Sequence, residues 1–234
     1  MSVTGAKNQV LSLLAGTLVI ILGLSSTGCD TQSKALLRSE GWTAIQEGRW
    51  DDAESMLTKA VAASPGDWRA NYLLARVRLH QGRALDAQLL LEHALTQNPA
   101  GEDTPKVQDA MAEALYQQGQ KLALTTFLEQ ASARTHAMTD YLRQAKYLGQ
   151  IGDTDGTRRA FRLACTFADP QDPKPYLALA DYYDSIGDRQ RAINALRYAY
   201  YLTPDSQGLI NKLRNWGVVP GPTFGLKPTG VPEF

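Results

Sequence analysis

The chain has little cysteine and no excess of either charge. Its two cysteines, Cys29 and Cys165, can form one disulfide at most, which excludes a disulfide-bonded framework. Lys and Arg together number 24, as do Asp and Glu, so no net charge attracts nucleic acid or an anionic membrane surface. With 234 residues, 44% of them hydrophobic, the chain is long enough for one sizeable domain or for an extended array.

The motifs of catalysis and metal binding are also missing. His80, His93 and His136 are scattered and lack the spacing of a helix-borne zinc site. The segment from Asp153 to Gly156 resembles the start of a calcium loop, but the later oxygen ligands are absent. No Gly-x-Ser-x-Gly or phosphate-binding Gly-Lys-Ser/Thr motif occurs. The sequence therefore predicts a protein that is not an enzyme and that needs no metal or other cofactor.

Residues 1–28 have the layout of a secretory signal peptide. A polar start with one cation, Lys7, precedes an apolar run from Val10 to Leu24 and then small residues before Cys29. The apolar run spans about 15 residues, whereas a helix that crosses a bilayer needs roughly 20. A permanent transmembrane helix is therefore disfavoured. The run leaves no polar face, which argues against an amphipathic helix of the folded domain.

The end of this segment, Thr27-Gly28-Cys29, resembles a lipobox, the site at which bacterial lipoproteins are cleaved and lipidated on the new N-terminal cysteine. Ser26 stands where that family usually has Leu, and Ser26 with Gly28 also fits the small-x-small pattern of ordinary signal peptidase. The resemblance implies lipidation of Cys29, a short tether over 29–33, and a membrane-anchored lipoprotein of the bacterial cell envelope that faces the periplasm or the exterior. Plain secretion is the alternative.

The rest of the chain repeats with a period near 34 residues. One set of five residues recurs 34 positions later as a second set: Gly48, Ala53, Leu57, Ala60 and Pro65, then Gly82, Ala87, Leu91, Ala94 and Pro99. A third copy has the same internal spacings: Leu179, Ala180, Tyr183, Gly187, Ala192, Leu196, Ala199 and Pro204. Two weaker copies lie around Gly119 and Gly152, and they have Leu124 and Thr157 where the strong copies have Ala.

Each shared residue type has a physical reason. The glycines permit the positive φ of a tight turn between two helices. Alanine at Ala53, Ala87 and Ala192 lets the paired helices approach closely, and the prolines end the second helix of each pair because they lack a backbone donor. One helix pair cannot bury its own apolar face, so neighbouring pairs must stack.

This pattern resembles the tetratricopeptide repeat, a helix-turn-helix unit, over about residues 34–204. The resemblance implies an all-α fold, a right-handed superhelical solenoid over 34–216. It contains about five repeats at 34–67, 68–101, 105–137, 138–170 and 173–206, and a capping helix at 206–216. Residues 217–234 are rich in Pro and Gly, which predicts an extended or flexible tail. Binding through Phe224 and Phe234 is the alternative for that tail.

The face of the first helices opposite the apolar stripe is the candidate binding site. The family commonly holds peptides or partner helices in a concave groove on this face. If the apolar stripe faces the stack, eleven residues should project toward that groove: Arg38, Trp42, Arg69, Tyr72, Arg76, His80, Asp109, Glu113, Tyr116, Arg143 and Lys146. The arginines can pair with acidic groups and the aromatic residues can anchor a partner. An ordinary solvated face is the alternative.

Together these observations predict a non-catalytic scaffold that binds a protein or peptide partner during envelope, secretion or pilus-type assembly. The alternatives are an accessory subunit that positions a separate envelope enzyme and a soluble secreted repeat protein. No nucleic acid partner is expected.

Overall fold

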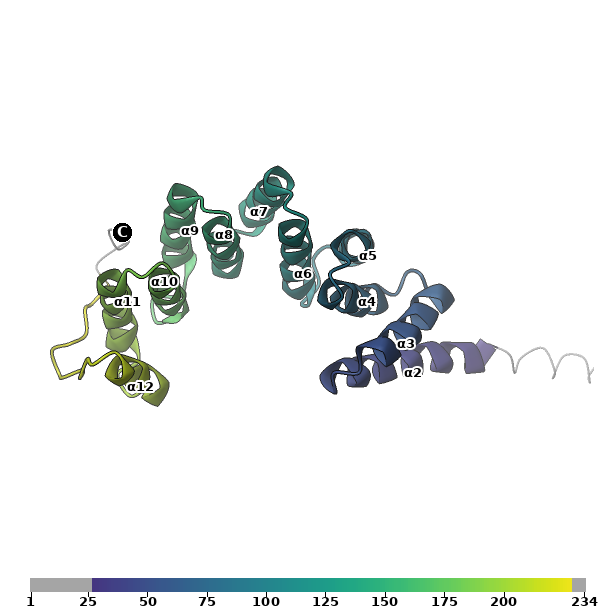
Figure 1. The fold of residues 1–234 in the computed structure, drawn as a ribbon, viewed down its shortest axis with the longest axis horizontal. Helices are drawn as coiled ribbons and strands as arrows, with labels where there is room; N and C mark the ends of the chain where they lie inside the picture. Colours follow the sequence, from purple (N-terminus) through teal and green to yellow (C-terminus); the bar gives the residue numbers. More distant parts are fainter. Residues whose placement is uncertain (1–26, 229–234) are drawn as a thin grey trace, which may run out of the picture. The chain divides into compact units, whose positions relative to one another are not determined.

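The computed structural model describes residues 27–228, and their side chains from Lys34 onward. Residues 1–26 of the predicted signal peptide lie outside the described residues. Phe234 and the side chain of Cys29 lie outside them as well. Between residues 27 and 228 the chain forms eleven helices and no strand (Figure 1). The predicted all-α fold is confirmed.

Ten of these helices alternate as first and second members of five pairs. The first members are α2 (Thr27–Gln46), α4 (Trp68–His80), α6 (Thr104–Gln117), α8 (Met138–Gln150) and α10 (Lys174–Ser185). The second members are α3 (Trp50–Ala63), α5 (Ala84–Gln97), α7 (Lys121–Thr135), α9 (Thr154–Phe167) and α11 (Arg189–Leu202), and α12 (Gln207–Asn215) follows. None of the helices described between residues 27 and 228 is long and apolar enough to cross a membrane.

The turn inside each pair is built on a glycine. The five predicted turn glycines have φ values between 68° and 83°: Gly48, Gly82, Gly119, Gly152 and Gly187. At the first of them, Gly48 N donates to Ile45 O at 3.2 Å and Arg49 N donates to Ala44 O at 2.8 Å, which satisfies carbonyls at the end of α2. The predicted positive φ is therefore confirmed, and it lets the second helix start within a few residues of the first.

Small or fully buried residues occupy the start of each second helix. Ala53, Ala87 and Ala192 are completely buried, as predicted. Leu124 and Thr157, at the same place in the two weaker repeats, are completely buried as well. The hydroxyl of Thr157 donates to Asp153 O at 2.6 Å, so its burial leaves no unpaired polar group.

The predicted prolines follow the ends of second helices. Pro65, Pro99 and Pro204 each lie two positions after the last residue of a helix, Ala63, Gln97 and Leu202 respectively. At the start of the chain, α2 begins at Thr27, so the segment 29–33, expected to be a tether, is helical. No Pro or Gly lies between Cys29 and Glu40 to interrupt that helix.

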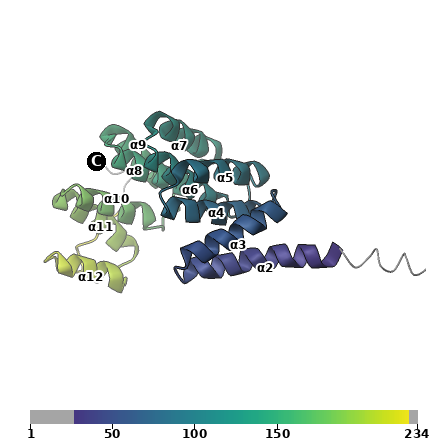
Figure 2. The same ribbon diagram turned by 45° about the vertical axis from the view of Figure 1, so that its right-hand side comes forward.

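The chain divides into two compact units between Val107 and Gln108. In the first unit α2 and α3 lie side by side, as do α4 and α5 (Figure 2). Their core contains Ala44, Leu57, Leu74 and Val77. The core of the second unit is built from α8 to α12, and includes Phe161, Leu179, Leu196, Leu209 and Leu213.

Glu54 joins α3 to the helix and turn that follow it. Its carboxylate accepts hydrogen bonds from Arg78 Nη1, from Gln81 Nε2 at 2.5 Å and from Arg83 Nη1 at 3.3 Å. The bonds from Gln81 and Arg78 lower the pKa of Glu54 below its ordinary value. The carboxylate therefore stabilises the first unit most when it is ionised.

We expect this bond network to make stability depend on pH. Because the pKa of Glu54 is lowered on folding, its contribution is complete above the unfolded value of 4.5 and is lost as the pH falls through the folded value. Glu54→Gln should lower the free energy of unfolding by about 1–3 kcal/mol at neutral pH and lose less stability below about pH 4.5. Urea unfolding at several pH values measures both effects. Glu129→Gln, at an exposed position, is the control, and equal pH profiles for Glu54→Gln and the unmodified chain would contradict this account.

The segment after α12 is fastened to α11. Phe224 meets Tyr200 edge-on with the ring centroids 5.5 Å apart. Arg197 Nε donates to Phe224 O at 3.0 Å, and Leu226 N donates to Arg197 O at 3.1 Å. Residues 217–228 form no helix, in keeping with their Pro and Gly content. They are nevertheless held in place because the Phe224 ring buries apolar surface against the core of the second unit.

Phe224→Ala should lower the free energy of unfolding by about 1–2 kcal/mol, since a half-buried aromatic ring contributes part of the value for full burial. Chemical denaturation followed by circular dichroism measures the loss. Val219→Ala in the same segment is the matched control, because Val219 is 80% exposed. A loss no larger for Phe224→Ala than for this control would show that the segment does not stabilise α11.

Candidate functional site

A groove of about 450 Å³ opens on the first unit, and we call it the arginine–aromatic groove. Its lining comes from α2, from α4 and from the start of α6 with the residue before it. The lining residues are Arg38, Ser39, Trp42, Trp68, Arg69, Tyr72, Leu73, Arg76, Asp103 and Lys106.

The helical period brings these side chains to one face. Arg38 and Trp42 are four residues apart on α2, and Tyr72 and Arg76 are four apart on α4. Residues at this spacing are neighbours on a helix surface. Ala70, which is fully buried, lies among the core residues of α4, so the groove side chains are carried by a helix that the core holds in place.

Aromatic rings hold two of the groove's arginines. The guanidinium carbon of Arg76 lies 5.2 Å from the ring centroid of Trp42 and 6.0 Å from that of Tyr72. The guanidinium carbon of Arg69 lies 4.4 Å from the ring centroid of Trp68. Such cation–π contacts orient an arginine without neutralising it. Trp42 is 43% exposed, so part of its ring is open to a partner.

The other two cations of the groove are paired with carboxylates. Arg38 forms an ion pair with Asp67. Lys106 Nζ lies 2.8 Å from Asp103 Oδ1, and this bond lowers the pKa of Asp103, with a smaller contribution from Arg69. Two of the four cations are therefore in ion pairs, and with Glu102 also close to Lys106 the four cations still outnumber the carboxylates beside them.

Five of the predicted binding residues are brought together here: Arg38, Trp42, Arg69, Tyr72 and Arg76. Sequence reasoning missed Trp68 and Lys106. Trp68 directly follows Asp67, whose side chain accepts from Arg69 N at 3.0 Å and caps α4. Aspartate is a preferred N-cap residue, so the sequence indicated that α4 begins at Trp68.

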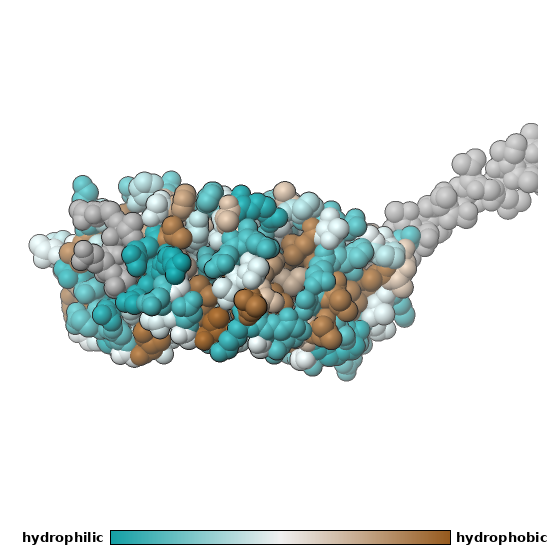
Figure 3. All heavy atoms as spheres, turned by 90° about the horizontal axis from the view of Figure 1, so that it is seen from above, coloured by the Kyte–Doolittle hydropathy of each residue, from teal (hydrophilic) through white to brown (hydrophobic). Residues whose placement is uncertain are grey.

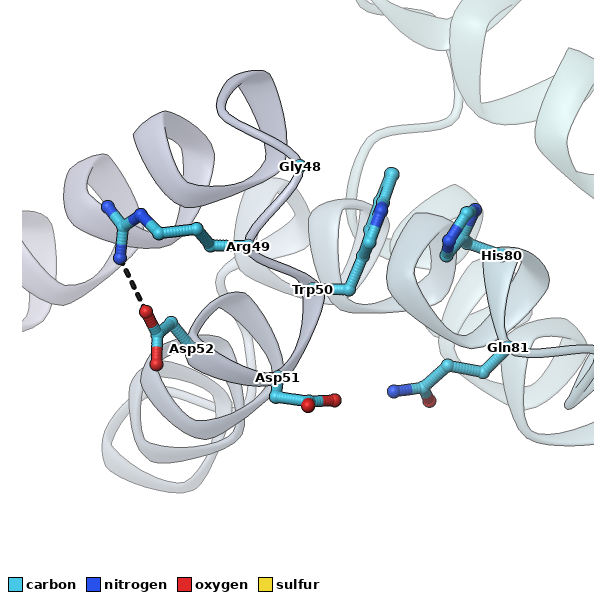
Figure 4. Close-up of a pocket in the computed structure, with 7 residues that line it drawn as sticks. All are labelled: Gly48, Arg49, Trp50, Asp51, Asp52, His80 and Gln81. Carbon is cyan, nitrogen blue, oxygen red and sulfur yellow. Dashed lines mark hydrogen bonds and ion pairs between the residues drawn. The ribbon is translucent and has the colours of Figure 1, made fainter.

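His80 lies apart from the other predicted residues of its unit. It lines a different hollow of about 560 Å³ with Gly48, Arg49, Trp50, Asp51, Asp52 and Gln81. Figure 4 shows its imidazole facing the indole of Trp50, and the ring centroids are 3.8 Å apart with an interplanar angle of 16°. Arg49 is paired with Asp52 at 2.6 Å in the same hollow. His80 therefore packs on α3 and does not line the arginine–aromatic groove.

Comparison with known proteins identifies the repeat. Models of the tetratricopeptide repeat family match residues 44–114 and 173–206. The chain carries tetratricopeptide repeats. No curated protein sequence matches it.

Solved structures of tetratricopeptide repeat proteins share the fold. The chain is similar to TTC0263, a thermophilic protein of this kind from Thermus thermophilus, with 20% identity, a TM-score of 0.55, and coverage of 78% of this chain and 97% of that one. It is also similar to a MamA protein, with 16% identity, a TM-score of 0.54, and coverage of 82% and 100%. A MamA from Desulfovibrio magneticus RS-1 gives 15% identity, a TM-score of 0.54, and coverage of 75% and 97%. The predicted solenoid of tetratricopeptide-like helix pairs is confirmed.

In the second unit, Arg143 was predicted to line a binding groove, but the structure gives it internal partners. Its side chain is only 3% exposed, and it pairs with Asp140 at 2.5 Å and with Asp109. It also donates to Gln108 Oε1 at 3.1 Å. Arg143 is long enough to reach from α8 to α6, so it joins two helices of the unit and its guanidinium is occupied by internal partners.

The remaining predicted residues gather around Tyr147, a buried tyrosine of α8. The Tyr147 hydroxyl donates to Glu113 at 3.0 Å, and the rings of Tyr147 and Tyr116 lie 6.0 Å apart. Lys146 Nζ lies 4.6 Å from the Tyr147 ring. Burial, with Glu113 next in effect, raises the pKa of Tyr147 above its ordinary value, so the hydroxyl stays protonated and remains a donor. Asp109, Glu113, Tyr116 and Lys146 thus surround an internal contact between α6 and α8.

Cys165 packs against the core of the second unit. Burial raises the pKa of its thiol to about 12. The thiol is therefore protonated at neutral pH, which makes it a poor nucleophile.

Proposed function

We propose that this chain is a non-catalytic scaffold of the bacterial cell envelope that binds a protein or peptide partner in the arginine–aromatic groove. The observation that carries the proposal is the groove itself, where arginines oriented by aromatic rings line a hollow of about 450 Å³. Aromatic residues and arginines are the side chains that most often dominate binding energy at protein interfaces. The groove is large enough to take a few side chains of a partner.

The tetratricopeptide framework suits this function. Its helix pairs present side chains from α2 and α4 on a surface held by a continuous core. Because all the groove residues except Asp103 belong to helices, little conformational entropy is lost when a partner binds.

The tether is the second part of the proposal. Thr27-Gly28-Cys29 after an apolar run supports cleavage at Cys29 and lipidation of its thiol. Several acyl chains, at about 0.8 kcal/mol per buried CH₂, would hold the folded repeats at a membrane surface. A scaffold fixed in this way raises the local concentration of any partner that reaches the same membrane.

Affinity capture from solubilised membranes tests the groove. The double variant Trp42→Ala/Arg76→Gln should lose the partner that the unmodified chain retains, because both the ring and the guanidinium that it orients are removed. Lys59→Gln is the matched control, since Lys59 is an exposed cation of α3 outside the groove. The same retained proteins with the double variant as with the control would refute the groove proposal.

Intact-mass measurement of the membrane-extracted protein tests the tether. We expect a mature chain that begins at Cys29 and carries the added mass of acyl groups. A chain that begins at an unmodified Cys29 would replace the lipoprotein with a secreted scaffold, and an uncleaved chain would refute the signal peptide.

A further inference from the structure

We infer that Arg76 binds a carboxylate of the partner, so that the arginine–aromatic groove selects an acidic peptide segment. The inference rests on the proposed function and names the chemistry of the partner at that same groove. It depends on the contacts of Arg76, on the charge of the groove and on the size of the groove.

Two aromatic rings contact the flat faces of the Arg76 guanidinium and fix its orientation. Trp42 and Tyr72 lie 5.2 Å and 6.0 Å from its guanidinium carbon, and both contacts are of the cation–π kind. Contacts with ring faces leave the N–H groups at the edge of the guanidinium able to donate. A carboxylate matches that edge with two parallel hydrogen bonds. The rings therefore orient Arg76 before a partner arrives.

Two carboxylates at the groove pair with cations other than Arg76. Asp67 pairs with Arg38, and Asp103 with Lys106. Arg76 takes part in none of the ion pairs that the described side chains form. Its half-buried guanidinium, whose described contacts are aromatic rings, therefore keeps a positive charge that an incoming carboxylate can neutralise.

The net charge of the groove points the same way. Arg38, Arg69, Arg76 and Lys106 lie beside three carboxylates, Asp67, Asp103 and Glu102, which leaves a surplus of positive charge at the groove of a chain whose total charge is zero. The surplus is therefore local, and it attracts a partner with acidic side chains at this position. On the face that Figure 3 shows, apolar residues form separate patches among hydrophilic ones.

A peptide fits these features better than a nucleic acid does. Asp67 and Asp103 lie beside the cations and would repel a continuous phosphate backbone, whereas a peptide can place one carboxylate at Arg76 and neutral groups elsewhere. The volume of about 450 Å³ also suits a few side chains.

Fluorescence anisotropy with two labelled peptides tests the inference on the full chain in detergent. One probe is a capped eight-residue peptide that alternates Glu and Ala, and the other has Gln in place of each Glu. We expect the Glu peptide to bind about tenfold or more tightly than the Gln peptide, and its affinity to fall as salt rises.

Variants locate the effect at Arg76. Arg76→Gln should weaken binding of the Glu peptide about tenfold, and Arg76→Lys should give an intermediate loss because it keeps the charge but not the flat two-donor edge. Lys59→Gln removes one positive charge outside the groove. It should change the affinity less than twofold, because salt screens an exposed charge that is distant from the peptide. Circular dichroism of each variant checks that the fold is kept.

Three results would overturn the inference: equal affinity for the two peptides, unchanged binding by Arg76→Gln, or stronger binding of an eight-residue oligothymidylate than of the Glu peptide. These results are separable from failure of the proposed function. If membrane capture depends on the groove while the Glu peptide is not preferred, the scaffold function stands and the acidic partner is refuted. If capture does not depend on the groove, the proposed function itself fails.

Discussion

Replacing Arg143 with methionine is expected to lower the free energy of unfolding by about 3–5 kcal/mol, because it leaves a buried carboxylate without its counter-charge. The side chains of Arg143 and Asp140 are 3% and 4% exposed, and they pair at 2.5 Å. Once Arg143 is lost, Asp140 keeps the hydroxyl of Thr135 as a donor but has no cation beside it in this network. Urea unfolding followed by circular dichroism measures the loss.

A second substitution should restore much of this stability. In Asp140→Leu/Arg143→Met both charges are gone, and removal of a whole buried pair is far less costly than removal of one partner. Arg162→Met, at an exposed position of α9, is the control and should change stability by less than about 0.5 kcal/mol. If Arg143→Met cost no more than Arg162→Met, the side chain would be solvated and the internal network would not exist as described.

Gly41→Ala is expected to lower the free energy of unfolding by about 1–3 kcal/mol through overpacking. A Cβ at Gly41 would lie 2.6 Å from Leu57 Cγ and 2.8 Å from Leu57 Cδ2. Leu57 is completely buried, so it has little room to move away. The absence of a side chain at Gly41 is thus what allows α2 and α3 to pack so closely.

Chemical denaturation of five chains tests this contact: the unmodified chain, Gly41→Ala, Leu57→Ala, their double variant and Gly66→Ala. Gly66→Ala is the matched control, because a Cβ there meets nothing within 4 Å, and it should be close to neutral. In the double variant Gly41→Ala/Leu57→Ala the two losses should not add, since the smaller residue at position 57 makes room for the new methyl group. Additive losses would mean that Gly41 and Leu57 do not compete for the same space.

Local rules explain why much of the fold could be predicted from the sequence. A tight turn between helices requires positive φ, and glycine at Gly48 and its four equivalents meets that need at a fixed spacing. Close helix pairs require small residues such as Ala53 and Ala87. These requirements act over a few residues and recur with the repeat, so a period near 34 residues reports them directly.

The site was harder to predict because it depends on tertiary contacts. In the sequence, Arg143 lies on the helix face where solvated cations are expected. Its burial follows from tertiary contacts, because it pairs with Asp109 on another helix and with Asp140. Lys106 reaches the groove because the long connection after α5 brings the start of α6 beside α4. Phe224 was one of several residues in a Pro- and Gly-rich segment, and its contact with Tyr200 follows from the path of that segment over α11.

Site-specific photocrosslinking in the native host tests the central claim most directly, namely that the arginine–aromatic groove binds a partner protein. A photoreactive phenylalanine analogue at Trp42 or Tyr72 should give a discrete higher-mass adduct, and the same analogue at Lys59 on α3 should not. Because Trp42 and Tyr72 line the groove and Lys59 does not, the account predicts this difference between positions. Equal adducts at all three positions, or an adduct at Lys59 alone, would contradict it.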